Sequence, residues 1–487
     1  MKWTDAQQSA IDAPRPGQLP SQTILVSAAA GSGKTAVLVE RMIQRLKRRE
    51  LSIQELMVVT FTKAAAAEMK ARIGVKLAEE FQATGDTYLE EQLNMLPSAH
   101  ISTLHSFCQW VIRSYFYKLD IDPSFTIGNE GELALMRYDV LDAILLQVYE
   151  QGLYNIYDVS DMFSTERSDQ ILRETVFQIY NFALAQSQPM RWLDQVCHTY
   201  ESALHQTLLE TTWGTLFWKE QQRQIEYLLE RYEEAQRLAT LGNGFDKWMD
   251  KVSELQTLLQ AMQKADTWDA MHVGVVGIGG FSFPVLRATK AMNESDPAIL
   301  SEIKAILAEG KEILQAMPKG VFAITEADWR EQMEYLVPLV RGIIQLVKRF
   351  HEDFQQAKQE AGMIDFSDLE HLCLALLVDP EFTEELKPSE VALELQDTFK
   401  EVMVDEYQDT NGVQEAIVNL VSRGDNRFYV GDVKQSIYGF RMADPQLFME
   451  KYHRFDHDVN SVERSIDLSQ NFRSHEAILN VTNFIFS

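Results

Sequence analysis

The chain has 487 residues, 46% of them hydrophobic and 24% charged, a composition typical of a globular protein with room for two or three domains. Its formal net charge of −27 excludes non-specific binding of nucleic acid over the whole surface, so any such contact must rest on particular residues. No apolar signal segment follows Met1, and the longest nearly apolar run, residues 271–283, is too short and too rich in glycine to span a bilayer. We therefore expect a cytoplasmic protein without membrane contact.

Residues 3–11 predict a short amphipathic helix that begins at Thr4 or Asp5 and turns Ala10 and Ile11 inward. Gln7 lies on this helix. Its side-chain amide offers a donor and an acceptor together, which suits the N6 and N7 edge of adenine. Taken alone, a glutamine on a helix is more typical of an ordinary surface position.

The apolar run at residues 24–26 is followed by a glycine-rich turn and then by a helical pattern from residue 37 onward. A strand, such a turn and a helix form the arrangement that grips nucleotide phosphates. Lys34 would meet the β- and γ-phosphates, and the Thr35 hydroxyl would meet Mg²⁺. The turn has alanine where the strict pattern has glycine, and the alternative is a helix start with small residues for packing. The segment comprises Ser27, Ala28, Ala29, Ala30, Gly31, Ser32, Gly33, Lys34 and Thr35.

Two further strand-to-helix junctions follow. Thr60, Phe61 and Thr62 end the buried strand predicted at residues 56–62, at the edge where open α/β sheets bind ligands. Two threonines around a ring can hold a phosphate and stack a base, although a capped helix start with a core phenylalanine explains them equally well. His105 lies at the second junction, residues 100–108, whose signal is weak by itself.

Between residues 120 and 360 long helical patterns dominate, with apolar residues at three- and four-residue spacing and acidic residues on the other faces. This stretch predicts a mostly helical domain inserted into an α/β domain. Within it, residues 273–283 carry several glycines without a phosphate-binding spacing, and we predict an apolar loop there.

A short apolar strand at residues 402–404 ends in Asp405 and Glu406. Asp405 would hold Mg²⁺ through water or Thr35, and Glu406 would orient or deprotonate the attacking water. An acidic pair after an apolar triplet is common, but a P-loop in the same chain makes this chemistry the better explanation.

Two segments near the end of the chain add polar groups to the predicted site. Gln435 lies close to Tyr438, Phe440 and Arg441, a set that fits a link between phosphate sensing and base stacking, or simply a core. Arg473 follows a predicted strand, where it could reach a γ-phosphate as an arginine finger.

The order of these segments, split by a helical insert, resembles the superfamily 1A helicases of the UvrD type. The matching segments are residues 29–35, 59–62, 405–409, 435–438 and 470–474. Within that superfamily, residues 27–42, 101–108 and 365–371 are similar to the AddA (RexA) components of bacterial AddAB helicase–nucleases.

The resemblance implies an α/β fold: a RecA-like P-loop NTPase domain with a parallel sheet and a large all-helical insert. It implies a first motor domain at residues 1–119 and 361–464, the insert at residues 120–360, and the start of a second motor domain at residues 465–487. The chain then resembles an N-terminal part of such a component, which we expect to bind nucleotide, to hydrolyse it poorly and not to unwind DNA.

The resemblance also implies roles for single residues. Gln7 would read adenine, and Phe472 would lie against it. Lys34, Thr35 and Asp405 would hold Mg²⁺ and ATP, Glu406 would be the catalytic base, and Gln435 and Arg473 would contact the γ-phosphate. Residues expected at single-stranded DNA are Thr60, Phe61, Thr62, His105, Tyr438, Phe440 and Arg441.

The implied function is that of an ATP-dependent 3′-to-5′ DNA helicase within a helicase–nuclease that processes double-strand breaks for recombinational repair. The implied partners are an AddB/RexB-type protein and both single-stranded and duplex DNA. Nuclease activity would belong to other parts of the full-length protein. A stand-alone UvrD-type repair helicase and a non-motor P-loop switch are the alternatives. Ala36 stands where many relatives have an arginine against adenine, and Lys63 replaces a common asparagine.

Overall fold

The computed structural model describes residues 3–14, 22–119, 125–163, 168–283, 287–293 and 296–486. The chain divides into two compact units, the first formed by residues 1–150, 163–192 and 346–487 and the second by residues 151–162 and 193–345. The second unit is smaller than the insert predicted at residues 120–360. Residue 120, the predicted boundary, lies outside the described residues, and the domain limits remain predictions.

The first unit is built around a six-stranded sheet of order β3-β2-β6-β7-β1-β8, in which every neighbouring pair is parallel. A parallel sheet brings the carboxyl ends of all its strands to one edge, and the segments singled out above follow those ends. The strands are β1 (Thr23–Ala28), β2 (Leu56–Thr60), β3 (His100–Thr103), β6 (Glu401–Val404), β7 (Arg427–Gly431) and β8 (Glu463–Leu468).

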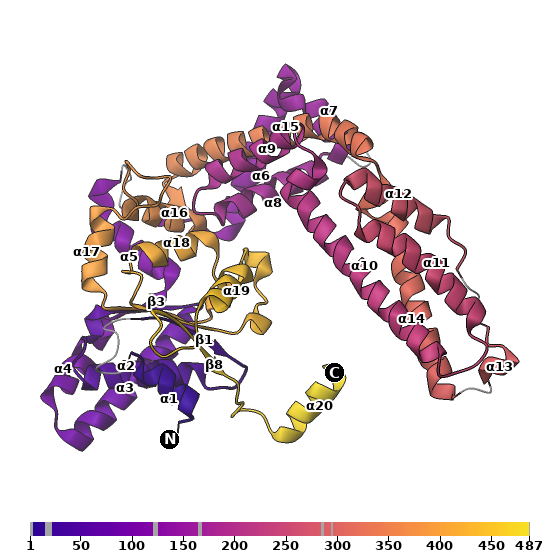
Figure 1. The fold of residues 1–487 in the computed structure, drawn as a ribbon. Coiled ribbons are helices and arrows are strands. Elements are labelled where there is room, and N and C mark those ends of the chain that lie inside the picture. Colours follow the sequence, from indigo (N-terminus) through magenta and orange to yellow (C-terminus); the bar gives the residue numbers. More distant parts are fainter. Residues whose placement is uncertain are drawn as a thin grey trace. The chain divides into compact units, whose positions relative to one another are not determined.

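Helices cover both faces of this sheet (Figure 1). Alternate side chains of β1 enter different cores: Ile24 and Val26 pack with one helical layer and Leu25 with the other. The first layer contains α1 (Asp5–Asp12), α2 (Lys34–Lys47), α3 (Lys63–Thr84) and α4 (Thr87–Met95), and the second contains α5 (Leu104–Tyr115), α16 (Phe366–Leu377), α17 (Glu390–Thr398) and α18 (Gly412–Leu420). The predicted α/β fold with a parallel sheet is confirmed.

The last strand, β8, pairs with β1 along its whole length, from Thr23 opposite Glu463 to Ala28 opposite Leu468. Residues 465–468, which we expected at the start of a second motor domain, therefore contribute an edge strand to the first sheet. Helix α19 (Pro445–Arg454) precedes β8, and α20 (Glu476–Phe486) follows the segment of residues 469–475.

The second unit is helical. Its core lies between α10 (Thr212–Ala239), α11 (Asp246–Gln263), α12 (Trp268–Gly279) and α14 (Pro297–Ala316). The second unit also contains nearly all of α7 (Ile156–Phe163), whereas α9 (Pro189–Ala203) and α15 (Glu326–Glu360) have residues in both units. Nearly all of α6 (Glu130–Gln151) and the whole of α8 (Gln170–Leu184) belong to the first unit, in which β4 (Thr126–Ile127) also pairs with β5 (Met363–Ile364). Within the described part of the chain, no helix combines the length and the apolar character needed to cross a bilayer.

The predicted apolar loop at residues 273–283 is wrong over most of its length, because α12 continues to Gly279. Met271, Val275 and Ile278 recur at helical spacing and are buried in the core of the second unit. A Cβ on Gly274 would lie 2.1 Å from Cγ of Met262, so this glycine allows α11 and α12 to approach closely. Packing against α11 thus outweighs the low helix propensity of glycine.

Candidate functional site: a P-loop with an aromatic surface beside it

The predicted P-loop lies between β1 and α2. Gly31 (φ +74°) and Gly33 (φ +85°) adopt left-handed backbone conformations, and Gly33 caps α2. Lys34 and Thr35 form the first turn of α2, where free backbone N–H groups and the helix dipole favour an anion. The loop therefore has the backbone geometry of a phosphate site.

The three alanines of the segment differ in their surroundings. Ala28 is the last residue of β1 and is fully buried in the core beneath the loop. The N–H of Ala29 donates to the carbonyl of Leu468 on β8, and Ala30 is exposed. Ala28 thus supports the loop from the sheet, whereas Ala30 lies at its surface.

Gln7 lies beside the P-loop. Thr4 and Gln7 form a capping box at the start of α1, as the sequence predicts for Thr4. The Gln7 amide donates to the carbonyl of Ser32 over 2.9 Å, and a Cβ on Gly33 would lie 3.3 Å from its Nε2. The predicted adenine reader and the phosphate loop therefore lie at one place.

A small pocket of about 170 Å³ opens beside Gln7. The first turn of α1 and the segment after β8, including Phe472, line it, and Phe472 is 61% exposed. The other lining residues are Thr4, Asp5, Ala6, Gln7, Ser32, Leu468, Ser469 and Gln470. An aromatic face and a side-chain amide at one pocket are the groups that a purine base needs.

The segment around Arg473 packs directly on the P-loop. The N–H of Phe472 donates to the carbonyl of Gly31 over 2.8 Å. Asn471 Oδ1 accepts from the N–H groups of Arg473 and Ser474, both over 2.9 Å, and so shapes the turn that presents Arg473. The structure thus brings Phe472 and Arg473 to the loop, and the exposed Arg473 is carried by a turn that the sequence patterns did not indicate.

Gly31→Ala is expected to displace this segment, because the new Cβ would lie 2.7 Å from Asn471 Oδ1 and 2.9 Å from Cβ of Arg473 on a backbone with positive φ. We expect ATP affinity to fall roughly tenfold and trypsin to cleave faster after Arg473, since such strain costs about 1–3 kcal/mol. Gly85→Ala is the matched control, because Gly85 also has positive φ but has open space at its Cβ. Unchanged cleavage and ATP affinity in Gly31→Ala would contradict the expectation.

Two of the four predicted catalytic residues, Lys34 and Glu406, form an ion pair; the other two are Gln435 and Arg473. Lys34 Nζ lies 2.7 Å from Glu406 Oε2, and Glu406 follows β6 with a left-handed backbone (φ +52°). Sites that hold a non-glycine residue in this conformation are often functional. Lys34 and Glu406 are thus close enough to act on one phosphate group.

A chain of hydrogen bonds runs from Glu406 to Gln435 through Gln408, which sequence reasoning missed. Gln408 Nε2 donates to Glu406 Oε2 over 2.9 Å, and Gln408 Oε1 accepts from the N–H of Asp432 over 2.9 Å. Asp432 in turn accepts from Gln435 Nε2 over 2.8 Å. Gln408 is 1% exposed. It lies within the matching segment at residues 405–409, but sequence reasoning assigned it no role, because its partners at Asp432 and Glu406 are set by the fold.

Asp405 bears a poorly compensated charge. Burial and the neighbouring Glu406 carboxylate raise the pKa of Asp405 to about 6, and only a 3.1 Å bond from the Glu406 N–H is found at its Oδ1 among the described residues. The Asp405 carboxylate and the Thr35 hydroxyl are hard oxygen ligands, which Mg²⁺ prefers. Two such ligands can suffice, because a bound Mg²⁺ usually keeps several of its waters. The donor set therefore fits a magnesium ion.

Asp405→Asn is expected to stabilise the nucleotide-free chain by about 1–3 kcal/mol at pH 8. The folded-state pKa of Asp405, about 6, exceeds the ordinary value of 3.8, so its charge destabilises the fold fully above pH 6 and not at all below about pH 4. Urea unfolding at pH 8 and pH 5 measures the difference, which should shrink at pH 5. Asp397→Asn, at an exposed position, is the control, and an equal stability change at both pH values would contradict this assignment.

An aromatic cluster lies next to Gln435. The rings of Phe61 and Tyr438 are 4.3 Å apart, those of Tyr438 and Phe440 are 5.7 Å apart, and the Arg441 guanidinium lies within 5.8 Å of all three. Phe440 is 74% exposed. The structure thus brings together three predicted DNA-contacting rings and one cation, which is the composition of a base-stacking surface.

The threonines on either side of Phe61 have local structural roles. Thr60 Oγ1 donates to the carbonyl of Thr62 over 3.0 Å, and Thr62 Oγ1 caps α3 by accepting from the N–H of Ala65. The capped helix start weighed above is thus present. Thr60 is buried, so its side chain is not accessible to DNA in this structure. Thr62 and Lys63 are exposed and remain accessible to a phosphate.

His105 lies at the start of α5, beside two residues that sequence reasoning did not assign. Its Nε2 lies 3.2 Å from Oε1 of the buried Glu370, and its ring lies 5.1 Å from that of Phe366, which is 51% exposed. Burial raises the pKa of Glu370 to about 7. The sequence signal available for Phe366 was its position immediately after the Asp365 helix cap, and its exposure is evident only from the structure.

The chain matches the family described as the UvrD/REP helicase N-terminal domain over residues 3–321 and 330–456. It is 41% identical over 504 residues to the A subunit of the ATP-dependent helicase/nuclease of Geobacillus kaustophilus, covering 100% of this chain and 39% of that protein. Proteins of the same name from Anoxybacillus flavithermus and Geobacillus thermodenitrificans are 38% and 40% identical, again over 100% of this chain and 40% and 39% of their own lengths. The chain thus spans about two fifths of the length of these relatives.

Proposed function

The chain belongs to the UvrD/REP helicase family, and from this membership we propose that it is the ATP-binding part of a motor that moves 3′-to-5′ along single-stranded DNA. We propose further that this motor serves a helicase–nuclease of the kind named in its relatives, acting on double-strand breaks for recombinational repair. The proposed partners are an AddB/RexB-type protein and both single-stranded and duplex DNA, and the cytoplasm is the proposed compartment. The nuclease activity in the relatives' name is assigned to none of these residues.

The proposed roles follow the contacts of each side chain. Lys34 would leave Glu406 to bind the β- and γ-phosphates, and Arg473 would approach the γ-phosphate from the turn packed on Gly31. Glu406 would then orient a water and accept its proton. Thr35 and Asp405 would hold Mg²⁺, which when bound neutralises phosphate charge.

The nucleobase and the DNA would meet separate groups. Gln7 would read the adenine edge, and Phe472 would cover its face at the small pocket beside α1. The stacking surface formed by Phe61, Tyr438 and Phe440 would hold successive bases, with Arg441 close to the backbone phosphates.

The observation that carries this proposal is the hydrogen-bond chain Glu406–Gln408–Asp432–Gln435. It begins at the ion pair with Lys34 and ends three residues before Tyr438. When a phosphate draws Lys34 away, the carboxylate of Glu406 loses its cation but keeps the Gln408 amide. A change at the phosphates could therefore reach Gln435 through hydrogen bonds, and from there the stacking surface through the three residues of chain that lead to Tyr438.

Gln408→Leu is expected to uncouple the two sites, because leucine keeps the volume but provides neither the donor nor the acceptor. We expect the ratio of single-stranded DNA affinities with and without a non-hydrolysable ATP analogue to fall towards one, from a wild-type ratio of roughly 5–150-fold. Fluorescence anisotropy of a labelled oligonucleotide measures both affinities.

Gln396→Leu is the control, since this amide bonds only the carbonyl of Leu420 among the described residues, on α18. If Gln408→Leu keeps the wild-type ratio of DNA affinities with and without the ATP analogue, Gln408 does not connect the two sites. A wild-type chain that binds nucleotide but no DNA would favour the non-motor switch over the proposed motor.

A further inference from the structure

Helix α1 is held at both of its ends. At its beginning, the Gln7 amide is fixed between the N–H of Thr4, at 3.0 Å, and the carbonyl of Ser32, at 2.9 Å. At its end lies the guanidinium of Arg41 on α2, a residue that is shielded from solvent and only 1% exposed. An eight-residue helix is only about 12 Å long, so a displacement at one end reaches the other.

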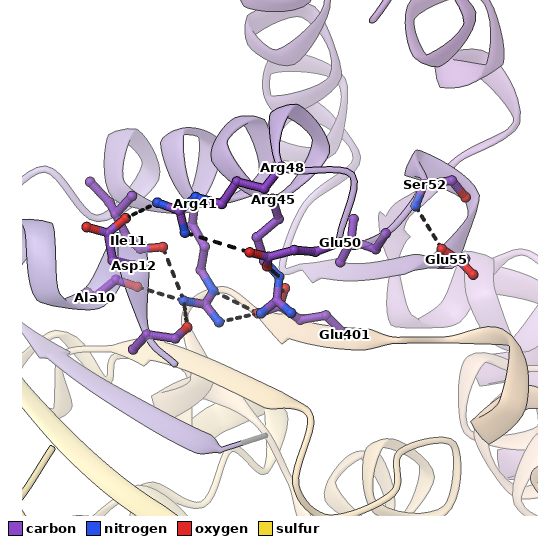
Figure 2. A network of polar contacts seen from close by, with 12 residues as sticks. Ala10, Ile11, Asp12, Arg41, Arg45, Arg48, Glu50, Ser52, Glu55 and Glu401 are labelled. Carbon is purple, nitrogen blue, oxygen red and sulfur yellow. Dashed lines mark hydrogen bonds and ion pairs between the residues drawn. The ribbon is translucent and has the colours of Figure 1, made fainter. Parts of the chain in front are cut away.

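Arg41 uses all three of its side-chain nitrogens in this position (Figure 2). Nη1 donates to the carbonyls of Ala10, at 2.8 Å, and Ala13, while Nε and Nη2 each lie 2.7 Å from Glu401 Oε1. The guanidinium also lies over the Phe428 ring, 4.3 Å from its centre. It therefore joins the end of α1 to the first residue of β6 and to β7.

The partners around Arg41 favour a guanidinium over an ammonium group. The last carbonyls of a helix have no partner within it, and they form the negative end of the helix dipole, so a cation there is favourable. A planar fork can serve carbonyls on one side and a carboxylate on the other, whereas an ammonium group is a single point of charge. Lysine at this position would keep the ion pair with Glu401 but lose part of the contact with α1.

We propose that Arg41 is a positioning residue for base specificity: by fixing the end of α1 it fixes the Gln7 amide beside the P-loop. The inference rests on the proposed reading of adenine by Gln7. Arg41 itself contacts neither the pocket nor the P-loop among the described residues. Its effect should therefore fall on recognition of the base and leave recognition of the phosphates unchanged.

The test compares affinities of the chain for ATP, GTP and inorganic tripolyphosphate by calorimetry, in the wild type and in Arg41→Lys. We expect the preference for ATP over GTP to fall roughly three- to tenfold, the value of one or two hydrogen bonds, with tripolyphosphate affinity within about twofold of the wild type. Gln7→Ala should lower the preference by the same amount. In the Gln7→Ala background, Arg41→Lys should then lower it no further.

Arg45→Lys is the matched control, because Arg45 also pairs with Glu401, at 3.3 Å (Figure 2), and forms no hydrogen bond or ion pair with α1 among the described residues. Its preference for ATP should not change. Glu401→Gln, which loosens the other side of the fork, should act like Arg41→Lys with a smaller effect and provides a second variant if Arg41→Lys does not fold.

The outcomes separate this inference from the proposed function. A Gln7→Ala variant that keeps its preference for ATP would overturn the adenine role and the inference together. A normal preference in Arg41→Lys, when Gln7→Ala has lost it, would overturn the inference alone. Equal losses of affinity for all three ligands would make Arg41 merely structural, whereas faster amide hydrogen exchange confined to residues 8–13 would support its action on α1.

Discussion

Glu406→Gln is expected to lower the rate of ATP hydrolysis by about 10²–10⁴-fold, the usual contribution of a general base, and at the same time to strengthen ATP binding. The opposite signs have one cause. Glu406 Oε2 is both the proposed proton acceptor and the partner of Lys34 at 2.7 Å. A glutamine cannot accept the proton, and it also leaves the lysine free to meet the phosphates.

Single-turnover hydrolysis with protein in excess, with and without an oligonucleotide, measures the first effect, and calorimetry with a non-hydrolysable analogue measures the second. Glu40→Gln is the matched control, because it removes another lysine–carboxylate pair, that with Lys76, on the same helix as Lys34. Hydrolysis at the wild-type rate in Glu406→Gln would remove Glu406 from the proposed mechanism. Weaker nucleotide binding would show that the ion pair does not compete with phosphate.

The elements that sequence reasoning found are those whose signal is local. About ten residues suffice to recognise an apolar strand that is followed by small residues and Gly-Lys-Thr, or by Asp405 and Glu406. Parallel strands then bring the ends of such segments to one edge of the sheet. The Thr4 cap of α1 is local in the same sense, and the structure confirms it.

The features that sequence reasoning missed depend on partners far apart in the chain. Gln408 acquires its contacts only when β7 lies beside β6, and Arg41 only when α1, α2 and β6 meet. The sequence around Arg41 is that of an ordinary helix, so it did not predict the contacts of this side chain with α1 and Glu401. The helix at residues 268–279 was missed because Gly274 and Gly277 pack against α11 instead of breaking the helix.

The double variant Tyr438→Ala/Phe440→Ala is expected to weaken binding of single-stranded DNA by about 2–6 kcal/mol, since each stacked base contributes about 1–3 kcal/mol. Tyr438 is held between Phe61, at 4.3 Å, and Phe440, at 5.7 Å, so both rings belong to one surface. In a chain of net charge −27, we expect few phosphate contacts beyond those proposed for Arg441 and Lys63, so most of the affinity at this surface should come from stacking.

Stacking and charge can be separated by salt. The weakening in Tyr438→Ala/Phe440→Ala should be nearly the same at about 50 mM and about 200 mM salt, because stacking releases no counterions, whereas Arg441→Gln should mainly reduce the salt dependence. Phe382→Ala is the control, because it removes an exposed ring that has its own lysine, Lys387, on a loop without a predicted DNA role. Unchanged DNA affinity after loss of both rings would mean that the cluster is a hydrophobic core of the turn after Gln435. The proposed motor would then not bind DNA through this surface.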